Sequence, residues 1–399
     1  MRRIGLYGSM FDPVHLDDVR LVTDALLRMR LDEVILLPYD TEEACLKTAS
    51  RRDRLNMLAL AFAGLPGVTL AEERFQPGLQ GLIDASGRVL ADADADLTLL
   101  IDAVGLPGFL NACSTTSTWD NCGLLVYPRR GEDHRSLVAE AAQRGFRVCV
   151  PDIVPLSCTD TVARGQIGRL SDAPDMLIPA VAEYIALHGL YQPPYQKLLR
   201  RSMNDRRYRH TLGVRDTAVR LARVHGISMQ KAAVAGLLHD CAKAMKLSQM
   251  QAIAKKYRLC LSRETLASDA LLHGPVGAEL ARVRYQIENP DVLNAIRYHT
   301  VGRAGMSGLE LCVYLADVIE PGRKAFPALN SIRALAEVSL EEATLKAMLA
   351  ARDYVLAKGE GYCTDSLEAI SDLHQKITMK RRSKNARKGF SPQNFADTI

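Results

Sequence analysis

The sequence predicts a protein of two domains, an N-terminal α/β domain with a parallel sheet and a C-terminal all-α bundle. Its 399 residues, 48% of them hydrophobic, exceed what one core usually organises and supply enough material for two. In the first half, short apolar runs alternate with helical patterns, whereas the second half shows helical patterns throughout. We place the domains at residues 1–192 and 193–375, followed by a basic, disordered tail at residues 376–399.

The strands of the N-terminal domain are predicted from apolar runs of three to five residues. Their alternation with helical stretches indicates a parallel sheet in which each strand is followed by a helix. Sheets of this Rossmann type bind nucleotides at the carboxyl ends of their strands. The expected strands are residues 4–7, 34–38, 97–101, 124–127 and 148–150, and the expected helices lie near residues 15–29, 51–63 and 133–144.

The boundary between the domains is predicted at Gln192-Pro193-Pro194. Paired prolines exclude a continuous helix and stiffen the connection. Beyond them the helical domain begins, and Asn204 or Asp205 is able to cap the helix that carries His210.

Four histidines and two aspartates of the C-terminal domain are the candidate metal ligands. Each lies in a helical pattern, and the spacing between them indicates that they come from different helices. Taken singly, each histidine is more often an ordinary core or surface residue. Together, imidazoles and carboxylates suit iron, manganese, zinc or nickel, and a pair of such ions can clamp a phosphate ester and provide a hydroxide for attack. The set is His210, His239, Asp240, His273, His299 and Asp317.

The adjacent pair His239-Asp240 ends an almost entirely apolar helical run that starts at Lys231. Neighbouring residues of a helix point about 100° apart, so both face one metal only near a helix end or when they bridge two ions. Asp240 is the natural bridging ligand. Two polar side chains at the end of an apolar run are unfavourable unless they are paired or bind metal, and a buried hydrogen-bonded pair is the simpler alternative.

The segments around these residues resemble one family throughout. They include Leu238-His-Asp-Cys-Ala-Lys243, Ile296-Arg-Tyr-His-Thr-Val-Gly-Arg303 and Tyr314-Leu-Ala-Asp-Val-Ile-Glu-Pro-Gly-Arg323. Together with residues 206–211 and 273–278, they resemble the HD-domain hydrolases of the YqeK type, symmetrical bis(5'-nucleosyl)-tetraphosphatases. The resemblance covers about residues 195–375. It implies an HD-domain helical bundle, an iron pair held by the six ligands, and conversion of diadenosine tetraphosphate and related dinucleoside polyphosphates into two ADP.

Basic residues beside the ligands suit a polyphosphate substrate. Lys243 follows the His-Asp pair by one helical turn and is able to neutralise a phosphate oxygen. Arg303 and Arg323 each follow a glycine and offer forked donors, and Glu320 is expected to orient one of them. A plain surface ion pair between Glu320 and Arg323 is the alternative. We expect Asp240, Lys243 and Arg303 to be catalytic, and Lys243, Thr300, Arg303 and Arg323 to bind the substrate.

The first loop of the chain, Tyr7-Gly-Ser-Met-Phe-Asp-Pro-Val-His15, resembles the G-G-x-F-D-P-x-H-x-G-H signature of nicotinate mononucleotide adenylyltransferases. A second likeness, Leu156-Ser-Cys-Thr-Asp160, matches that family's I-S-S-T-E, and the resemblance spans roughly residues 1–192. It implies a nucleotidyltransferase-like fold whose vestigial nucleotide site contains Gly8, His15, Ser157 and Thr159.

Several elements of the adenylyltransferase signature are changed in this sequence. Asp17 and Asp18 replace the glycine and the second histidine, and two carboxylates repel a polyphosphate. Ser9 replaces the second glycine, residues 41–47 replace the P-P-H-K stretch, and Val162 stands where the family has an arginine. We therefore expect an inactive domain. The alternative is weak adenylyltransferase activity through His15, Ser157 and Thr159, with Arg164 replacing the lost arginine.

Three functions remain open at this point. The leading hypothesis is symmetrical hydrolysis of diadenosine tetraphosphate. A second is an HD phosphohydrolase that acts on another nucleotide, and a third is a regulatory protein in which both halves are inert sensors. The intact ligand set argues against the third.

Composition predicts a cytoplasmic protein. No apolar stretch of eighteen residues appears, and the N-terminus runs directly into a strand-like segment, so neither a membrane span nor a signal peptide is expected. The nine cysteines are scattered without a C-x-x-C pair and are interpreted as reduced thiols. Seven basic residues and no acid lie between residues 376 and 388, which is the sole indication of nucleic-acid binding, a partner we do not expect. The sequence does not determine whether the protein forms a homodimer.

Overall fold

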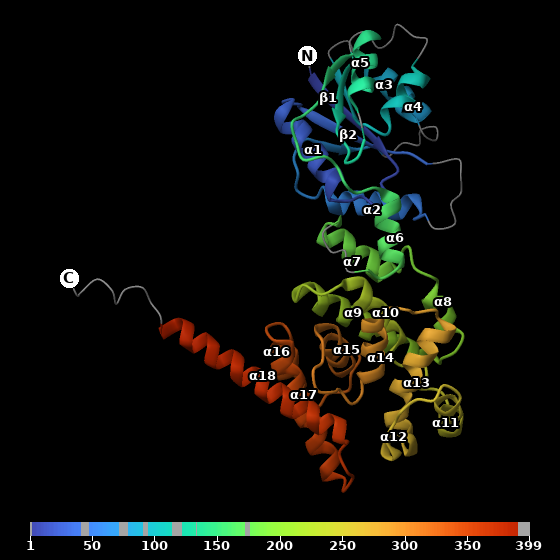
Figure 1. Cartoon of the computed structure of the whole chain (residues 1–399), viewed down its shortest axis with the longest axis vertical. Helices are drawn as coiled ribbons and strands as arrows, with labels where there is room; N and C mark the ends of the chain where they lie inside the picture. The colour runs from blue at the N-terminus through green and yellow to red at the C-terminus, as the bar shows by residue number, and fades with distance from the viewer. Residues whose placement is uncertain are drawn as a thin grey trace, which may run out of the picture. The chain divides into compact units, whose positions relative to one another are not determined.

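The computed structural model describes residues 2–40, 48–71, 79–90, 95–113, 122–132, 134–171 and 176–389. The chain separates into two compact units, Met1–Tyr184 and Ile185–Ile399 (Figure 1). The division falls within helix α7 (Pro179–His188). The domain boundary at Pro193-Pro194 stays a prediction. The replaced P-P-H-K stretch at residues 41–47 lies outside the described residues.

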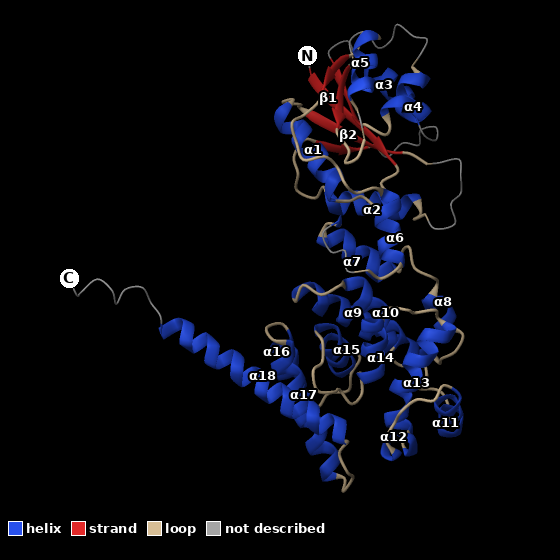
Figure 2. Ribbon diagram, in the orientation of Figure 1, coloured by secondary structure: helices blue, strands red, loops and turns tan. Residues whose placement is uncertain are grey.

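The N-terminal unit is built on a six-stranded parallel sheet, drawn red in Figure 2. The strand order is β3-β2-β1-β4-β5-β6, so the first strand lies between the second and the fourth. In sheets of this order, ligands bind outside the carboxyl ends of the strands where the order reverses, here between β1 and β4. The strands are β1 (Arg2–Ser9), β2 (Glu33–Pro38), β3 (Val68–Leu70), β4 (Ala95–Asp102), β5 (Gly123–Tyr127) and β6 (Arg147–Cys149).

The helices of this unit cover the sheet and bury its apolar side chains. Leu6 and Leu99 of neighbouring strands share one core cluster with Phe109 of α4. The predicted α/β fold is confirmed, and each expected strand and helix is present. The helices are α1 (Leu16–Arg28), α2 (Arg51–Ala61), α3 (Leu79–Leu90), α4 (Leu106–Ala112), α5 (Arg135–Gln143), α6 (Asp160–Gly168) and the first part of α7.

The C-terminal unit is helical in all its described elements, as the sequence predicts. Asn204 caps α9 by accepting a hydrogen bond from the Arg207 N–H at 2.9 Å, which confirms the predicted helix start. Its helices are α8 (Tyr195–Arg200), α9 (Asp205–Val224), α10 (Met229–Leu238), α11 (Leu247–Lys256), α12 (Arg263–Ala267), α13 (Asp269–Arg284), α14 (Pro290–Tyr298), α15 (Gly308–Ile319), α16 (Leu329–Ala336), α17 (Leu340–Ala357) and α18 (Thr364–Gly389).

Two glycines let helices of this unit approach closely. A Cβ on Gly236 of α10 would lie 3.0 Å from the Arg215 Cα of α9, and one on Gly274 of α13 would lie 2.6 Å from the Arg297 carbonyl oxygen of α14. Contacts this short exclude any larger side chain unless the helices separate. The backbones that carry the candidate ligands are therefore in direct contact.

The predicted tail differs from the structure over its first part. Helix α18 continues to Gly389, so residues 376–389 are helical where the sequence indicated disorder. Lys380 and Arg381 pair with Glu341 and Glu342 of α17, which ties this stretch to the bundle. Residues 390–399 lie outside the described part of the chain. Among the helices that the structure describes, none is both long and apolar enough to cross a membrane.

Candidate metal centre

The structure brings all six predicted ligands together in the C-terminal unit. His210 comes from α9, Asp317 from α15 and His273 from α13, while His239 and His299 end α10 and α14. Five of the six side chains form two overlapping groups, and within each group the potential ligand atoms lie within 4.8 Å of one another. One group is His210, His239 and Asp317, and the other is His239, Asp240 and His299. The sixth, His273, contacts the second group through Asp240 and His299.

The carboxylates lie between the imidazoles. His210 Nε2 is 3.1 Å from Asp317 Oδ1, and His273 Nε2 is 3.3 Å from Asp240 Oδ1. The same Asp240 oxygen is 3.6 Å from His299 Nε2, and its other oxygen is 3.8 Å from His239 Nε2. Asp240 thus contacts three imidazoles, which is the position the sequence predicts for a bridging ligand.

Backbone carbonyls fix the orientation of three imidazoles. His239 and His299 cap the C-terminal ends of their helices, and each Nδ1 lies 2.7 Å from the carbonyl oxygen three residues earlier, those of Gly236 and Ile296. His273 Nδ1 lies 3.1 Å from the Asp269 carbonyl oxygen. Since a carbonyl oxygen can only accept, Nδ1 carries the proton and Nε2 of each ring offers a lone pair to the cluster.

The electrostatic environment sets the protonation states that metal ligands require. Burial lowers the pKa of His239 to about 4 and also lowers the pKa of His273. Burial acts to raise the pKa of Asp240, but His239, His273 and His299 outweigh it and hold that pKa far below its usual range. At neutral pH the Asp240 carboxylate is ionised and the imidazoles of His239 and His273 are neutral, which is the state in which both kinds of group bind metal.

One atom of the cluster lacks a protein partner. His239 is fully buried, yet among the described residues its Nε2 has no hydrogen-bond partner. A buried polar atom left unsatisfied costs about 1–3 kcal/mol, so such atoms usually serve a bound group. The lone pair points into a set of nitrogen and oxygen donors, and this set fits divalent metal ions.

The polar residues predicted to bind substrate occupy different places. Lys243 Nζ lies 3.1 Å from His273 Nε2, and Thr300 Oγ1 lies 3.1 Å from the Nε2 atoms of both His273 and His299, so both reach the cluster. Arg303 instead makes a bidentate pair with Glu310, at 2.6 and 3.0 Å. Its predicted contact with substrate stays a prediction.

Glu320 corrects one expectation from the sequence. Its side chain is buried, and Oε1 lies 3.2 Å from His210 Nδ1, so it orients a ligand and not an arginine. The alternative of a surface pair with Arg323 is also wrong, because Arg323 Nη1 lies 3.5 Å from Asp317 Oδ1. The last turn of α15 and the turn after it therefore contribute three groups to the site. These are the candidate ligand Asp317, the Arg323 guanidinium beside it, and the Glu320 carboxylate that contacts His210.

A separate cluster in the N-terminal unit surrounds His15, which the sequence assigns to a vestigial nucleotide site. His15 lies between two carboxylates, with Nδ1 3.1 Å from Asp18 Oδ2 and Nε2 3.6 Å from Asp160 Oδ1. Tyr7 donates its hydroxyl to Asp18 at 2.6 Å. Burial, followed by the charge of Asp18, raises the pKa of Asp160 to about 6.

Asp17, which with Asp18 replaces residues of the adenylyltransferase signature, accepts hydrogen bonds from backbone amides. The N–H groups of Ser157 and Cys158 donate to its Oδ2 at 2.7 and 2.9 Å. These amides precede α6, whose N-terminus Thr159 caps through a hydrogen bond from the Val162 N–H at 3.2 Å. Amides at a helix start commonly bind phosphate, and here they bind an internal carboxylate.

The remaining residues expected at this site are also engaged within the protein. Arg164, the proposed substitute for a lost arginine, pairs with the buried Asp12 at 3.2 Å. Gly8 lies beside Tyr39 and Leu82, and a Cβ added there would be 3.1 Å from Leu82 Cδ1. His15, the backbone amide of Ser157 and Arg164 thus each contact another residue of the chain.

Comparison with known proteins decides the family. The HD domain family matches residues 207–322, a range that contains all six candidate ligands. A protein of Halalkalibacterium halodurans named "Bis(5'-nucleosyl)-tetraphosphatase, symmetrical" is 36% identical over 177 residues, 44% of this chain and 94% of that relative. This chain belongs to the family of symmetrical bis(5'-nucleosyl)-tetraphosphatases. It is an HD-domain phosphohydrolase, as the sequence motifs predict.

The N-terminal half of this hydrolase has relatives of its own. A protein of Bordetella avium named "Probable nicotinate-nucleotide adenylyltransferase" is 30% identical over 198 residues, 48% of this chain and all of that relative. A Mycoplasma genitalium protein named "Probable nicotinate-nucleotide adenylyltransferase/Ap4A hydrolase" is 26% identical over 328 residues, 81% of this chain and 89% of the relative. The predicted fusion of an adenylyltransferase-like domain with an HD hydrolase is therefore confirmed.

A pocket of about 620 Å³ lies at the candidate metal centre of this hydrolase. Basic side chains line it, and three of them were not predicted from the sequence. Arg206 and Arg209 line it from α9, and Lys324 lines it together with the predicted Arg323. The signal was present, since residues 206, 209, 210 and 213 recur at helical spacing and so share the face of α9 that carries His210.

Proposed function

We propose that this protein hydrolyses diadenosine tetraphosphate symmetrically into two ADP. The observation that carries the proposal is the convergence of the six ligands beside a pocket lined by four cations. The names of its relatives supply the substrate, and a chain of four phosphates matches the charge of that pocket.

The six side chains would hold a pair of divalent ions, and the family resemblance favours iron. His210, His239 and Asp317 form one half of the site, while Asp240, His273 and His299 form the other. Asp240 contacts imidazoles of both halves and is the proposed bridge. When bound, the ions would neutralise phosphate oxygens and lower the pKa of a water molecule.

The other polar residues would bind and orient the phosphates. Lys243 and Thr300 reach the His273 side of the cluster and would hold the phosphate that is cut. Arg323 lies beside Asp317, and Arg206, Arg209 and Lys324 continue the positive surface outward from it. A polyphosphate extending along this surface would place an inner phosphorus at the cluster, which accounts for a cut in the middle of the substrate.

The test is product analysis with the iron-loaded full chain. We expect ADP as the sole product of diadenosine tetraphosphate on anion-exchange chromatography. His239→Ala removes a ligand common to both groups and is expected to abolish both activity and metal retention. His374→Ala, which changes an exposed histidine of α18, is the matched control and should leave both unchanged.

The products also separate this proposal from its alternatives. AMP plus ATP would show an asymmetric cut and contradict the proposal. No turnover by a metal-loaded protein would direct the search to other nucleotides, with release of phosphate or a linear dinucleotide as the sign of a different HD activity.

For the N-terminal domain we propose that adenylyltransferase activity is lost. Two contacts support this proposal. Asp17 accepts hydrogen bonds from the backbone amides before α6, and Asp18 and Asp160 flank His15, so internal carboxylates would compete with a triphosphate for these groups. Neither ATP nor nicotinate mononucleotide is expected to raise the melting temperature of a variant that lacks the C-terminal domain. A clear shift, or formation of the dinucleotide, would support the alternative of a bifunctional enzyme.

A further inference from the structure

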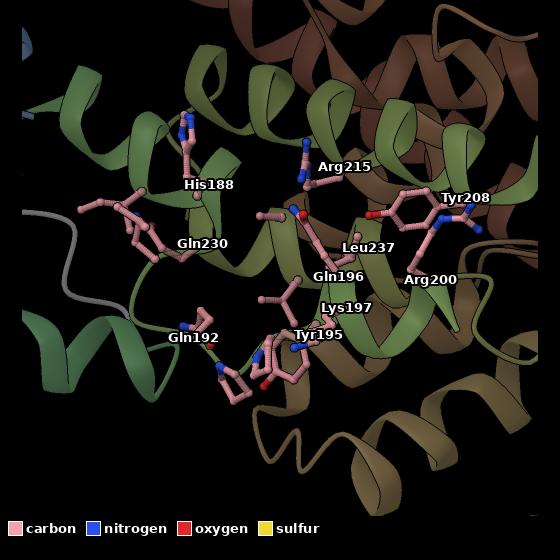
Figure 3. A pocket seen from close by; sticks show the side chains of 18 of the residues that line it. His188, Gln192, Tyr195, Gln196, Lys197, Arg200, Tyr208, Arg215, Gln230 and Leu237 are labelled. Atoms are coloured by element: carbon pink, nitrogen blue, oxygen red, sulfur yellow. The ribbon is translucent and has the colours of Figure 1, made fainter. Parts of the chain in front are cut away.

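A second pocket lies in the C-terminal unit, away from the metal centre. Its volume is about 610 Å³, within the range of small-molecule sites, which is roughly 300–1,000 Å³. Figure 3 shows its side chains converging from the end of α7, the following loop, α8, α9 and α10. On α9 it is lined by Tyr208 and Arg215, whereas His210 and Gly213 face the metal-centre pocket. Helical spacing places these two pairs on opposite faces of α9.

The charge of this second pocket is entirely positive among the described residues that line it. Lys197, Arg200, Arg201 and Arg215 contribute to the lining, and no aspartate or glutamate does. Arg200 pairs with Asp205 and Arg215 with Asp216, and both carboxylates are exposed. Lys197 and Arg201 make no ion pair with any described residue, and the side chains of both are exposed. The pocket therefore offers cations to an anionic ligand.

The remaining lining is apolar and aromatic. Ala233, Val234 and Leu237 of α10 form one wall, and Tyr195 and Tyr208 supply aromatic rings. Flat aromatic and aliphatic surfaces suit a heterocyclic base, which stacks without requiring specific hydrogen bonds. Basic side chains beside this apolar and aromatic surface are the combination that suits a phosphorylated ligand with a heterocyclic base.

The walls of this pocket are anchored to the C-terminal unit. Ala186 at the end of α7 packs with Val219 of α9 and Ala233 of α10 in one buried cluster. Tyr195 is 6% exposed and packs edge-to-face against Tyr285, with ring centroids 6.3 Å apart. These contacts hold the segment around the paired prolines against the helical bundle, so the pocket is preformed.

We propose that this pocket binds a nucleoside triphosphate, with the base against the α10 wall and the phosphates at Lys197 and Arg201. The site is separate from the metal centre and from the vestigial N-terminal site. The proposal does not depend on the hydrolase reaction. Since Gly236 of α10 lies directly against the Arg215 backbone, a ligand here would contact the same two helices that hold His210 and His239.

The test is photolabelling of the full chain with 8-azido-ATP, followed by mass spectrometry of the labelled peptides. We expect label within residues 185–237, competed by ATP but weakly by adenosine or by inorganic tripolyphosphate, because each lacks half of the ligand. The double variant Lys197→Glu with Arg201→Glu should label at least tenfold less at the same concentration. Circular dichroism would verify that the variant is folded.

A matched control changes the same net charge elsewhere. Lys255→Glu with Lys346→Glu replaces two exposed lysines of α11 and α17 that do not line the pocket, and it should label as the natural chain does. Equal labelling of both double variants, or label confined to peptides of the metal centre or of the N-terminal unit, would overturn the proposal. Because the readout is the labelled position, failure of the hydrolase assay would not affect it.

Discussion

The buried carboxylate of Glu320 contacts a candidate ligand, His210, without belonging to the predicted ligand set. It lies 3.2 Å from His210 Nδ1, on the side of the ring opposite the Asp317 contact. The carboxylates of Asp317 and then Glu320 outweigh burial and raise the pKa of His210. A carboxylate behind an imidazole fixes the ring and increases its basicity, and loss of such a partner typically weakens metal binding 10–100-fold.

Glu320→Gln is therefore expected to reduce metal affinity about tenfold or more. The glutamine keeps the size of the side chain but not its charge, so the melting temperature of the metal-free protein should change little. Metal content after dialysis against a competing chelator is the measurement. Glu337→Gln, which alters a surface carboxylate paired with Arg220, is the control. Equal retention by both variants would contradict a positioning role for Glu320.

Asp160 allows a prediction about stability and pH. Its pKa, about 6 in the folded chain, is above the ordinary value of about 3.9. A carboxyl with a raised folded pKa stabilises the fold below the unfolded pKa and loses that contribution as the pH rises through the folded pKa. At pH 7, ionised Asp160 thus lowers the stability of the N-terminal unit.

Asp160→Asn is expected to raise the free energy of unfolding by about 1–3 kcal/mol at pH 7, and the gain should disappear near pH 4. Differential scanning calorimetry at the two pH values measures it. The exposed Asp152→Asn serves as the control. A gain of the same size at both pH values would show that the charge of Asp160 is not its cause.

At the scale of elements, the contact between α9 and α10 determines how two ligands meet. A Cβ on Gly236 would face backbone atoms of α9, and backbone cannot rotate away as a side chain can. The same residue provides the carbonyl that orients His239. Separation of these helices would therefore disturb packing and ligand geometry together.

Gly236→Ala is expected to destabilise the C-terminal unit by about 1–3 kcal/mol, as overpacking typically does. It should also lower metal retention, because His239 moves with its helix. Urea unfolding and metal analysis measure the two effects. Gly165→Ala, in helix α6 with open space around it, should instead be neutral or stabilising. If both alanines behave alike, the close approach of α9 and α10 has no energetic role.

Strands marked by apolar runs were predictable, and some other elements were not. The ligand-bearing helices and five strands, among them the three-residue β6, follow from apolar spacing, whereas the three residues of β3, Val-Thr-Leu, are too few for their alternation to be recognised. The helical part of residues 376–389 was missed because charge composition alone indicated disorder, while Lys380 and Arg381 find partners on α17. Those partners lie far away in sequence, where local composition carries no information about them.

For the candidate site, residue types and flanking motifs predicted which side chains lie together, but not how they are arranged. The structure brings the six candidate ligands into one cluster, and their roles stay a prediction. The partner of Glu320 and the engagement of Arg303 by Glu310 depend on side-chain directions that no spacing rule determines. The vestigial site likewise showed its carboxylates in sequence, but not that Asp17 accepts the amides before α6.

At the scale of the whole molecule, the two halves are expected to function independently. The Halalkalibacterium halodurans relative consists almost entirely of the part that matches this chain's C-terminal half. A fragment of residues 193–399 should therefore fold and hydrolyse diadenosine tetraphosphate at a rate comparable to that of the full chain. Circular dichroism and the product assay measure this. An unfolded or inactive fragment would show that the N-terminal domain is required by its neighbour.

The origin of the ligands in five different helices has a further consequence. Along the chain, His210 is the first of the six candidate ligands and Asp317 is the last. Ions bound to them would cross-link helices that are otherwise held together only by packing. Binding to the folded state alone adds about 4 kcal/mol when free metal exceeds the dissociation constant a thousandfold. When metal is scarce, the protein would lose both its activity and this stabilisation, and the less stable chain would be more easily degraded by proteases. The amount of this protein in a cell would therefore follow the supply of its ions.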